Sequence, residues 1–315
     1  MAEKNLVTIT GYLKENTLEQ IVSKNGKNAI RGNLIIATSD IESHRVQFYV
    51  SETTSSGAES KEYKGLLELL PGKTRTIASI LESDRTATFA SACEMASKVW
   101  VAGYFDEYAK RTDTGEISVV QIRGRRGGFR TASTTSAPFE PKTRFEVEAY
   151  LYEMTPEVDQ DGNETGRLSI VGLLQNYDQF VIKIGFVAPV EDGIADYIKN
   201  NYAVSDTVHI NGVLLNVMHR VLVESASESH FGAGGKDQYS TTFVNERQIT
   251  GGDAKPIKEG TDGSITKNAV KIGLAKRESK IMANSTKAAA APTAQSALAK
   301  GFGASATASS DDVDF

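Results

Sequence analysis

The sequence has one cysteine, Cys93, among 315 residues. A single cysteine excludes an intramolecular disulfide and a cysteine-rich zinc site. The four histidines, at positions 44, 209, 219 and 230, show no metal-ligand spacing, so no metal or other cofactor is predicted. Because a chain without disulfides suits a reducing compartment, we expect a cytoplasmic protein.

Long apolar runs are also missing. No run approaches the ~20 residues that a transmembrane helix needs, and the first residues, MAEKNLVTIT, lack the basic and apolar regions of a signal peptide. We therefore expect a protein that neither spans a membrane nor is exported by such a signal. With 40% hydrophobic residues over 315 positions, the chain is long enough for two folded domains.

Catalytic motifs are missing as well. PGKT at 71–74 resembles the end of a phosphate-binding P-loop, but Leu67 stands where the first glycine is required. The acidic turn at Asp159 and Asp161 has Ile170 where a calcium-binding loop needs a glutamate. No nucleophile, base and orienting group can be assembled, so the chain is not predicted to be an enzyme.

Acidic residues are absent from one arginine-rich segment, although the whole chain carries a net charge of −5. Residues 121–131, QIRGRRGGFRT, contain four arginines and no acid. Local charge decides which surface meets a phosphate backbone, so the net charge does not exclude nucleic acid. The glycines predict a flexible backbone with adaptable phosphate contacts. A basic linker without a ligand is the alternative.

An internal repeat organises the chain. Residues 7–36 align with residues 145–174, and VWVAGYF at 99–105 matches VHINGVL at 208–214. A shared order of elements over about 100 residues indicates a duplicated domain. We predict a first domain at 1–131, a linker at 132–143, a second domain at 144–252 and a tail at 253–315.

Each copy is predicted to be a small β-barrel. Alternating apolar positions in the first copy predict strands at 6–14, 29–38, 44–51, 98–106 and 116–123. Helical segments at 64–83 and, in the second copy, 193–202 fall between the third and fourth strands. Five strands with a helix at this place are the order of an OB-fold, whereas an immunoglobulin-like sandwich would have about seven strands and no helix. The predicted fold class is mainly β, with two tandem OB-fold domains and a disordered C-terminal tail.

The outward positions of the first copy combine aromatic rings with arginines and lack acids. A merely solvated face would be rich in Glu and Lys, whereas exposed rings stack on unpaired bases and arginines contact phosphates. The predicted single-stranded DNA-binding residues are Tyr12, Arg31, Arg45, Tyr49, Trp100, Tyr104, Arg123, Arg125, Arg126, Phe129 and Arg130. The alternative is that Tyr49, Trp100 and Tyr104 lie under the 51–65 loop or in a subunit interface.

The second copy does not repeat this face. Its first strand presents Glu146 and Glu148 where phosphates would have to pass. We therefore place the main site in the first copy, and the second copy either binds the strand by another route or serves for packing.

The composition changes after residue 250. Residues 288–310 are rich in Ala, Ser and Gly and cannot bury enough apolar surface to offset the entropy of ordering, which predicts disorder. Residues 264–284 could form a basic helix, transiently or on binding. The sequence then closes on DDVDF at 311–315.

An OB-fold, a low-complexity tether and an acidic tip ending in phenylalanine together resemble the single-stranded DNA-binding proteins (SSB) of bacteria and bacteriophages. In those families the tip is a docking peptide, and the resemblance implies this role for Asp311, Asp312, Val313, Asp314 and Phe315. The chain lacks the Ile-Pro before the phenylalanine and has two OB copies instead of one, which makes a phage-type protein the better match.

This resemblance implies a protein that coats and protects single-stranded DNA in the host cytoplasm. It also implies recruitment of replication, recombination and repair enzymes, such as a polymerase, a helicase-primase or a nuclease. It leaves open whether the chain forms a homo-oligomer. The alternatives are a structural or assembly protein that uses OB barrels as interaction modules, and an RNA-binding OB protein.

Overall fold

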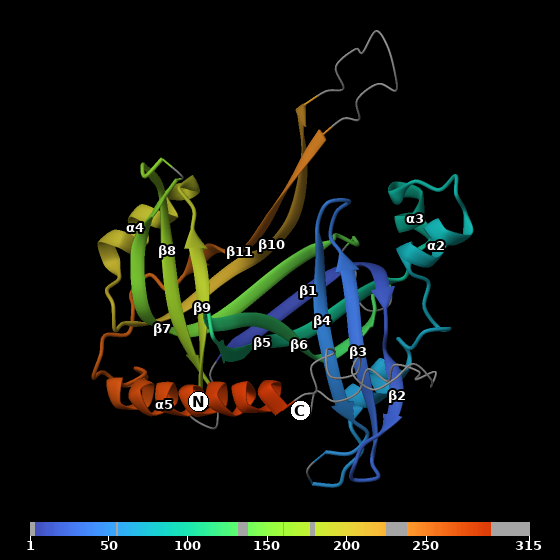
Figure 1. Ribbon diagram of the computed structural model, residues 1–315, viewed down its shortest axis with the longest axis horizontal. Helices are drawn as coiled ribbons and strands as arrows, with labels where there is room; N and C mark the ends of the chain where they lie inside the picture. Colours follow the sequence, from blue (N-terminus) through green and yellow to red (C-terminus); the bar gives the residue numbers. More distant parts are fainter. Residues whose placement is uncertain are drawn as a thin grey trace, which may run out of the picture.

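Eleven strands form one continuous sheet that closes into two barrels (Figure 1). The computed structural model describes residues 4–54, 56–131, 138–159, 161–176, 180–224 and 238–290, without the side chains of 219–224, 238–240 and 286–290.

The first barrel is a closed ring of five strands with one short extra strand. β1 pairs with β3 and β5, β3 with β4, and β5 with β6, all antiparallel, while β4 and β6 are parallel and close the ring. This is the strand order of an OB-fold. The strands are β1 (Asn5–Asn16), β2 (Glu19–Val22, which extends the sheet at β3), β3 (Asn28–Ala37), β4 (Ser43–Ser51), β5 (Lys98–Thr112) and β6 (Gly115–Phe129).

The second barrel repeats the same pairings. β7 pairs with β8 and β10, β8 with β9, and β10 with β11, while β9 and β11 meet in parallel at Val187 and Gln248. The strands are β7 (Lys142–Val158), β8 (Glu164–Gln175), β9 (Val181–Ala188), β10 (Thr207–Glu224) and β11 (Gln238–Gly252). The prediction of two OB-folds from the internal repeat is confirmed by these pairings. The exact domain boundaries stay a prediction, because residues 132–137 of the linker lie outside the described residues.

Helices follow the third strand of each barrel, as predicted. In the first barrel they are α1 (Lys61–Leu67), α2 (Ile77–Ser83) and α3 (Phe89–Met95), and in the second they are a 3-10 turn (Glu191–Gly193) and α4 (Ile194–Asn201). The sequence predicts no helix at α3, because FASACEM is short and its small residues give no clear apolar period. Thr88 nevertheless begins it with a capping box that pairs its side chain with Ser91.

The two barrels join through their equivalent first strands. β1 and β7 pair antiparallel, with Val7 opposite Phe145 and Ile9 opposite Thr143. Val7 and Phe145 are the same position of the repeat, so each strand presents the same segment to the other. Such self-complementary pairing is typical of a two-fold interface between identical subunits. In this chain, duplication has placed both halves of that interface in one polypeptide.

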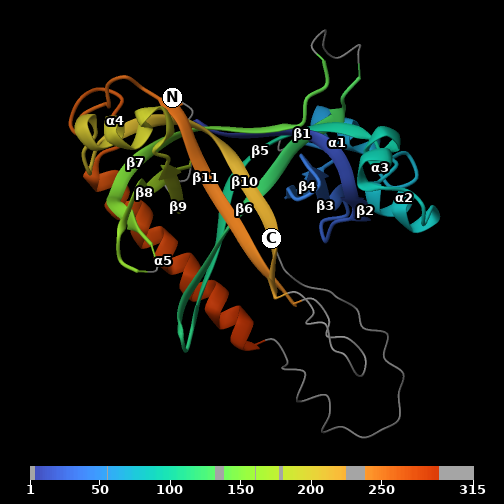
Figure 2. The same ribbon diagram turned by 90° about the horizontal axis from the view of Figure 1, so that it is seen from above.

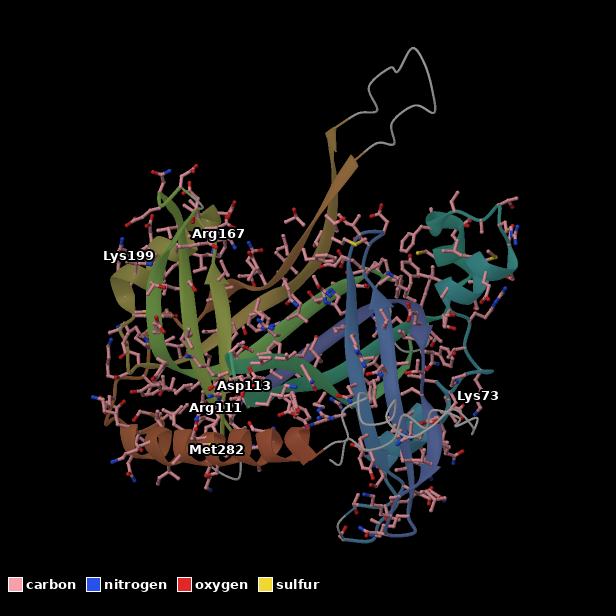
Figure 3. The ribbon with its side chains drawn as sticks, viewed as in Figure 1. Lys73, Arg111, Asp113, Arg167, Lys199 and Met282 are labelled. Carbon is pink, nitrogen blue, oxygen red and sulfur yellow. The ribbon has the colours of Figure 1, made fainter. Side chains whose placement is uncertain are left out.

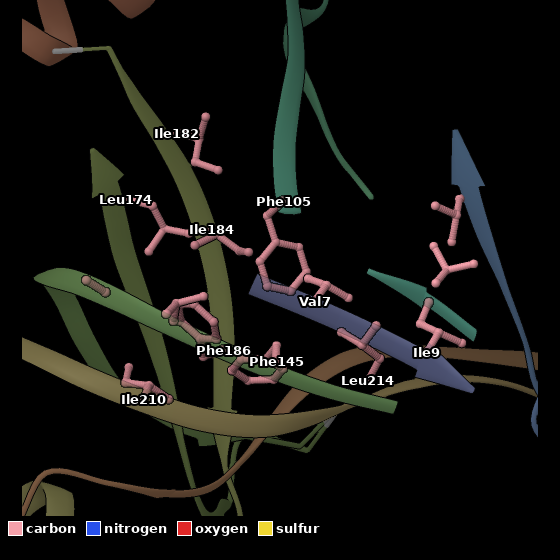
Figure 4. Packing of buried hydrophobic residues seen from close by; sticks show 14 of the residues in the cluster. Val7, Ile9, Phe105, Phe145, Leu174, Ile182, Ile184, Phe186, Ile210 and Leu214 are labelled. Carbon is pink, nitrogen blue, oxygen red and sulfur yellow. The ribbon is translucent and has the colours of Figure 1, made fainter. Parts of the chain in front are cut away.

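One hydrophobic core runs across the join. Phe105 of the first barrel packs edge-on against Phe145, with ring centroids 5.8 Å apart, and Phe145 lies 5.6 Å from Phe186 of the second barrel (Figure 4). All three rings are buried. Aromatic pairs of this kind contribute about 0.5 to 1.5 kcal/mol beyond the area that they bury. The shared core therefore fixes the orientation of one barrel relative to the other.

Helix α5 (Lys267–Ala290) lies along β5 and reaches β8 and β9 of the second barrel (Figures 1 and 2). The prediction that the tail is disordered from residue 253 is therefore wrong for this part of the chain. Ile265, Val270 and Ile281 are buried, and Arg277 enters a buried ion pair with Glu107. Residues 291–315, with the predicted docking tip, lie outside the described residues.

The helices of the described ranges were also compared with the length and apolarity that a membrane span requires. None of them meets both conditions.

Candidate nucleic-acid interface

The outer surface of four neighbouring strands brings part of the predicted site together. Across this surface Arg31 of β3 pairs with Tyr49 of β4, Gln47 of β4 lies beside Arg123 of β6, and Arg123 pairs with Tyr104 of β5. We call this surface the β4–β6 face; its residues are Arg31, Asn33, Arg45, Gln47, Tyr49, Tyr104, Gln121, Arg123, Arg125 and Arg126.

A shallow pocket of about 330 Å³ lies on the β4–β6 face. Tyr49, Tyr104 and Arg125 line it together with Ser51, Thr53, Thr54, Ser60 and Glu62. The Arg125 guanidinium lies over the Tyr104 ring, 4.8 Å from its centroid, and Tyr49 is 44% exposed. Aromatic rings and guanidinium planes are the surfaces on which unpaired bases stack. The 51–65 segment flanks these rings, and it leaves Tyr49 accessible.

The arginines of this face differ in their partners. Arg31 Nε lies 2.7 Å from Glu19 Oε1, and Arg123 Nε lies 3.2 Å from Asp106 Oδ2. Arg45 Nε donates instead to the neutral Asn33 Oδ1 at 3.0 Å. Among the described residues, Arg45, Arg125 and Arg126 have no carboxylate partner. These three guanidiniums carry the uncompensated positive charge of the face.

The RGRRGGFR segment is part of β6 and is not the flexible backbone that its glycines predict. A Cβ on Gly124 would lie 2.2 Å from the Phe48 ring, and a Cβ on Gly128 would lie 3.1 Å from Trp100 Nε1. Close packing therefore requires glycine at position 124 and makes the contact at Gly128 tight. The register shifts between Ala102 and Gly103, where β6 carries one residue more than β5. Such a bulge re-aims side chains, and here Arg125 and Arg126 are both exposed.

Four predicted residues lie elsewhere. Tyr12 is half-buried beside α2 and α3 and contacts Phe139 edge-on at 5.1 Å; burial raises the pKa of its phenol. Trp100 is half-buried against Gly128, and Phe129 packs on the core. The buried Nε of Arg130 has no hydrogen-bond partner among the described residues. The eleven predicted residues thus form two groups, and the exposed ones, Arg31, Arg45, Tyr49, Arg125 and Arg126, all lie on the β4–β6 face.

Two acids on the first strand of the second barrel, Glu146 and Glu148, have partners from both barrels. Glu146 lies 3.0 Å from Lys4 Nζ and 2.8 Å from Arg144 Nη2, and the Lys4 hydrogen bond lowers its pKa. Glu148 lies 2.9 Å from His209 Nε2. Of the two carboxylates that the sequence places in the path of a phosphate backbone, Glu146 is therefore ion-paired and Glu148 is hydrogen-bonded to the His209 imidazole.

A second pocket, of about 300 Å³, lies between the barrels. Arg45, Gln47 and Gln121 of the β4–β6 face line one side, and Asn216, Asn245 and Arg247 of β10 and β11 line the other. The sequence analysis missed Arg247, because its place depends on how the barrels meet. The sequence indicates only that Arg247 shares one side of β11 with Phe243 and Asn245, because side chains alternate along a strand.

A metal centre was also sought. Within the described ranges, no group of three or more His, Cys, Asp or Glu side chains could hold a metal ion.

Solved structures of single-stranded DNA-binding proteins resemble the fold only distantly. A deletion mutant and the wild-type form of the protein from Thermus aquaticus give TM-scores of 0.48 and 0.44, at 12% and 11% identity. The alignments cover 84% of this chain and 100% and 98% of those chains. A replication protein A heterotrimer bound to ssDNA gives 0.18 at 10% identity, covering 90% of this chain and 71% of that chain. At these scores the OB-fold assignment rests on the strand pairings of the chain itself.

Sequence comparisons add one finding. No curated protein matches the chain significantly. The sequence model of the YorF family matches residues 3–287, which is most of its length, and the chain therefore belongs to the YorF family.

Proposed function

We propose that the protein binds single-stranded DNA on the β4–β6 face and catalyses no reaction there. The observation that carries the proposal is the combination, on one open surface of an OB barrel, of Tyr49 and Tyr104 with three arginines that have no carboxylate partner among the described residues, Arg45, Arg125 and Arg126. OB-folds bind oligonucleotides on this surface, around their second and third strands. Bases would stack on the two rings and on Arg125, while Arg45 and Arg126 would contact phosphates.

Binding of this kind depends little on the base sequence of the DNA. Every base has a π-face, so stacking tolerates any order of bases. The positive charge would be provided by flexible guanidinium groups and would be weakened by salt. The protein would accordingly coat exposed single strands.

The test is the affinity for a fluorescently labelled oligo-dT, measured by anisotropy. Stacking is worth ~1 to 3 kcal/mol per base, so Tyr49→Ala with Tyr104→Ala should weaken binding by about 2 to 6 kcal/mol. Tyr152→Ala, which removes an exposed ring from the second barrel, is the matched control and should bind like the wild type. Equal affinity of the double mutant and the wild type would place the site elsewhere.

The proposal extends to recruitment of replication, recombination and repair enzymes by residues 311–315. The support is the acidic, phenylalanine-terminated sequence DDVDF. Deleting these five residues should leave DNA affinity equal or slightly higher at low salt, because a tethered anion competes weakly with phosphate. Pull-downs on single-stranded DNA should then lose partner enzymes. An unchanged set of partners would refute this part.

A further inference from the structure

The pocket between the barrels is held open by contacts that join β10 to the turn before β4. Asn216 Nδ2 donates to the Ser43 carbonyl at 2.6 Å, and the Met218 N–H donates to the Ile41 carbonyl at 3.0 Å. Together with the shared phenylalanine core, these bonds fix the distance between the two walls. The pocket is thus a built feature of the interface between the barrels.

Its lining mixes apolar with polar residues, and its two guanidiniums, Arg45 and Arg247, outnumber the one carboxylate, Glu246. Among the described residues, Arg247 has no carboxylate partner; its Nη1 lies 3.4 Å from the Gly185 carbonyl, and its guanidinium lies 5.8 Å from the centre of the Phe105 ring. The neighbouring Glu246 already pairs with Arg167. Arg45 adds a second guanidinium without an acid partner.

The Arg247 side chain is partly buried, and it has no carboxylate partner in the described part of the chain. Burial lowers the pKa of Arg247, and a partly desolvated charge without a counter-ion is costly. His44, which also lines the pocket, is buried, and burial lowers its pKa in spite of Glu42. A phosphate entering the pocket would supply the missing counter-ion.

The pocket is continuous with the β4–β6 face at one end and with an exposed hairpin at the other. Arg45, Gln47 and Tyr49 follow one another on the same side of β4. On β11, Phe243 lies on the same side as Arg247 and is 70% exposed. Figure 1 shows the β10–β11 hairpin projecting beyond its barrel. The Phe243 ring therefore lies past the hairpin end of the pocket, and the Tyr49 ring lies past its other end, on the β4–β6 face.

We propose that a single strand of DNA bound on the β4–β6 face continues through the pocket between the barrels, where Arg247 binds a phosphate and Phe243 stacks on a base. The inference rests on the proposed function and assigns the second barrel a part in it. The strand would enter this barrel along β11 and so avoid the first strand with Glu146 and Glu148.

Oligonucleotide length separates the two parts of the path. A single OB-fold covers about 4 to 16 nucleotides, so oligo-dT of about 6 nucleotides should report the β4–β6 face and about 20 nucleotides the whole path. Phe243→Ala should weaken binding of the long oligonucleotide by about 5- to 150-fold, the equivalent of one lost stack. The short one should bind as it does to wild type.

The contribution of Arg247 is measured separately, by the salt dependence of binding. Arg247→Gln should reduce the slope of log K against log salt by about 0.7 for the long oligonucleotide, because one phosphate contact is lost. Arg247→Lys keeps the charge and should keep the slope. Phe243→Ala changes only an exposed residue and should fold normally. Its control is Tyr152→Ala, which removes an exposed ring that lies away from the path.

The outcomes distinguish this inference from the proposed function. If the wild type binds neither length, the proposed function fails. If both lengths bind and the variants match wild type at every length, the strand follows another route and the inference is overturned. It is also overturned if Phe243→Ala leaves DNA binding intact and instead changes the oligomeric state, since Phe243 would then contact a second copy.

Discussion

At the scale of single residues, the partner of each arginine decides what it can do for a ligand. Arg31 and Arg123 pair with Glu19 and Asp106. Asp106 follows Tyr104 by two residues, so alternation places it on the same side of β5, whereas Glu19 lies on β2, a strand that was not predicted from the sequence. Exposed ion pairs contribute little to stability, but they neutralise the charge that a phosphate would meet. Arg125 and Arg126 have no such acid among the described residues, and the bulge in β6 exposes both.

We therefore predict that Arg125→Ala with Arg126→Ala reduces the dependence of DNA affinity on salt. Each phosphate contact contributes a slope of about −0.7 in log K against log salt for a single strand, so the double variant should lose about 0.7, the contribution of Arg126. Titrations at several salt concentrations measure this. Arg85→Ala, which removes an exposed arginine between α2 and α3, should leave the slope unchanged; an equal change in both variants would point to a general charge effect.

At the scale of elements, α5 depends on one buried charge. Arg277 donates to Glu107 at 2.9 Å and 2.6 Å, and Glu107 is 2% exposed. Ser118 and the Lys183 N–H also donate to this carboxylate. A second contact lies near the tip of the β5–β6 hairpin, where Arg111 pairs with Glu278 at 2.8 Å beside α5 (Figure 3). The helix thus ties the hairpin of the first barrel to the second barrel.

Arg277→Met should destabilise the protein by about 3 to 5 kcal/mol, because it leaves the Glu107 carboxylate buried without a counter-charge. Arg111→Ala breaks an exposed pair and should cost less than about 1 kcal/mol. Urea unfolding measures both. A loss for Arg277→Met as small as that for Arg111→Ala would mean that α5 contributes little.

The Glu107–Arg277 pair also predicts how the stability of the protein changes as the pH falls. Burial raises the pKa of Glu107, but hydrogen bonds from Arg277, Ser118 and Lys183 outweigh it and hold the pKa below its usual value. A carboxyl with a lowered folded pKa contributes stability above its unfolded pKa of about 4.3, and this is lost as the pH falls through the folded value. Arg277→Met should remove this contribution.

His209 makes stability depend on pH in the opposite direction from Glu107. It joins β10 to Glu148 of β7 at 2.9 Å and to Asp253, just after β11, at 2.8 Å. Burial lowers its pKa, but the hydrogen bonds to Glu148 and Asp253 outweigh burial and raise the pKa. Its contribution is fully present below the unfolded pKa of about 6.5 and is lost as the pH rises through the folded value.

We predict that the melting temperature of the wild type falls as the pH rises above about 6.5, and that His209→Gln shows a smaller fall. Melting curves at several pH values measure both. His44 serves as the comparison. Burial lowers its pKa, so His44 should not contribute stability that is lost as the pH rises. Identical pH profiles of wild type and His209→Gln would contradict the argument.

At the scale of the whole molecule, the sequence predicts what is periodic and repeated. Strand alternation and the alignment of Ile9 with Val147 were sufficient for two OB barrels, because both follow from local patterns. A helix at 264–284 was expected only transiently or on binding, and the stable docking of α5 was missed, since it depends on Glu107, far away in the sequence. Arg247 was missed since only the pairing of β1 with β7 brings it to the β4–β6 face. Contacts between distant segments have no local signature.

The duplication also explains how a single chain presents a long surface. Pairing of the two equivalent first strands fixes the barrels back to back, and the pocket between them connects one outer face to the β10–β11 hairpin. A surface of this kind suits an extended ligand better than a compact one. It is the reason that we expect affinity to rise with oligonucleotide length.

Photocrosslinking tests the central claim most directly, because it names the residues that touch the ligand. Oligo-dT carrying 5-iodouracil should be crosslinked to the wild-type protein and the modified peptides identified by mass spectrometry. The account predicts crosslinks at Tyr49 and Tyr104, lost in Tyr49→Ala with Tyr104→Ala. Crosslinks confined to Tyr12 and Trp100, or to the second barrel without the β4–β6 face, would contradict it.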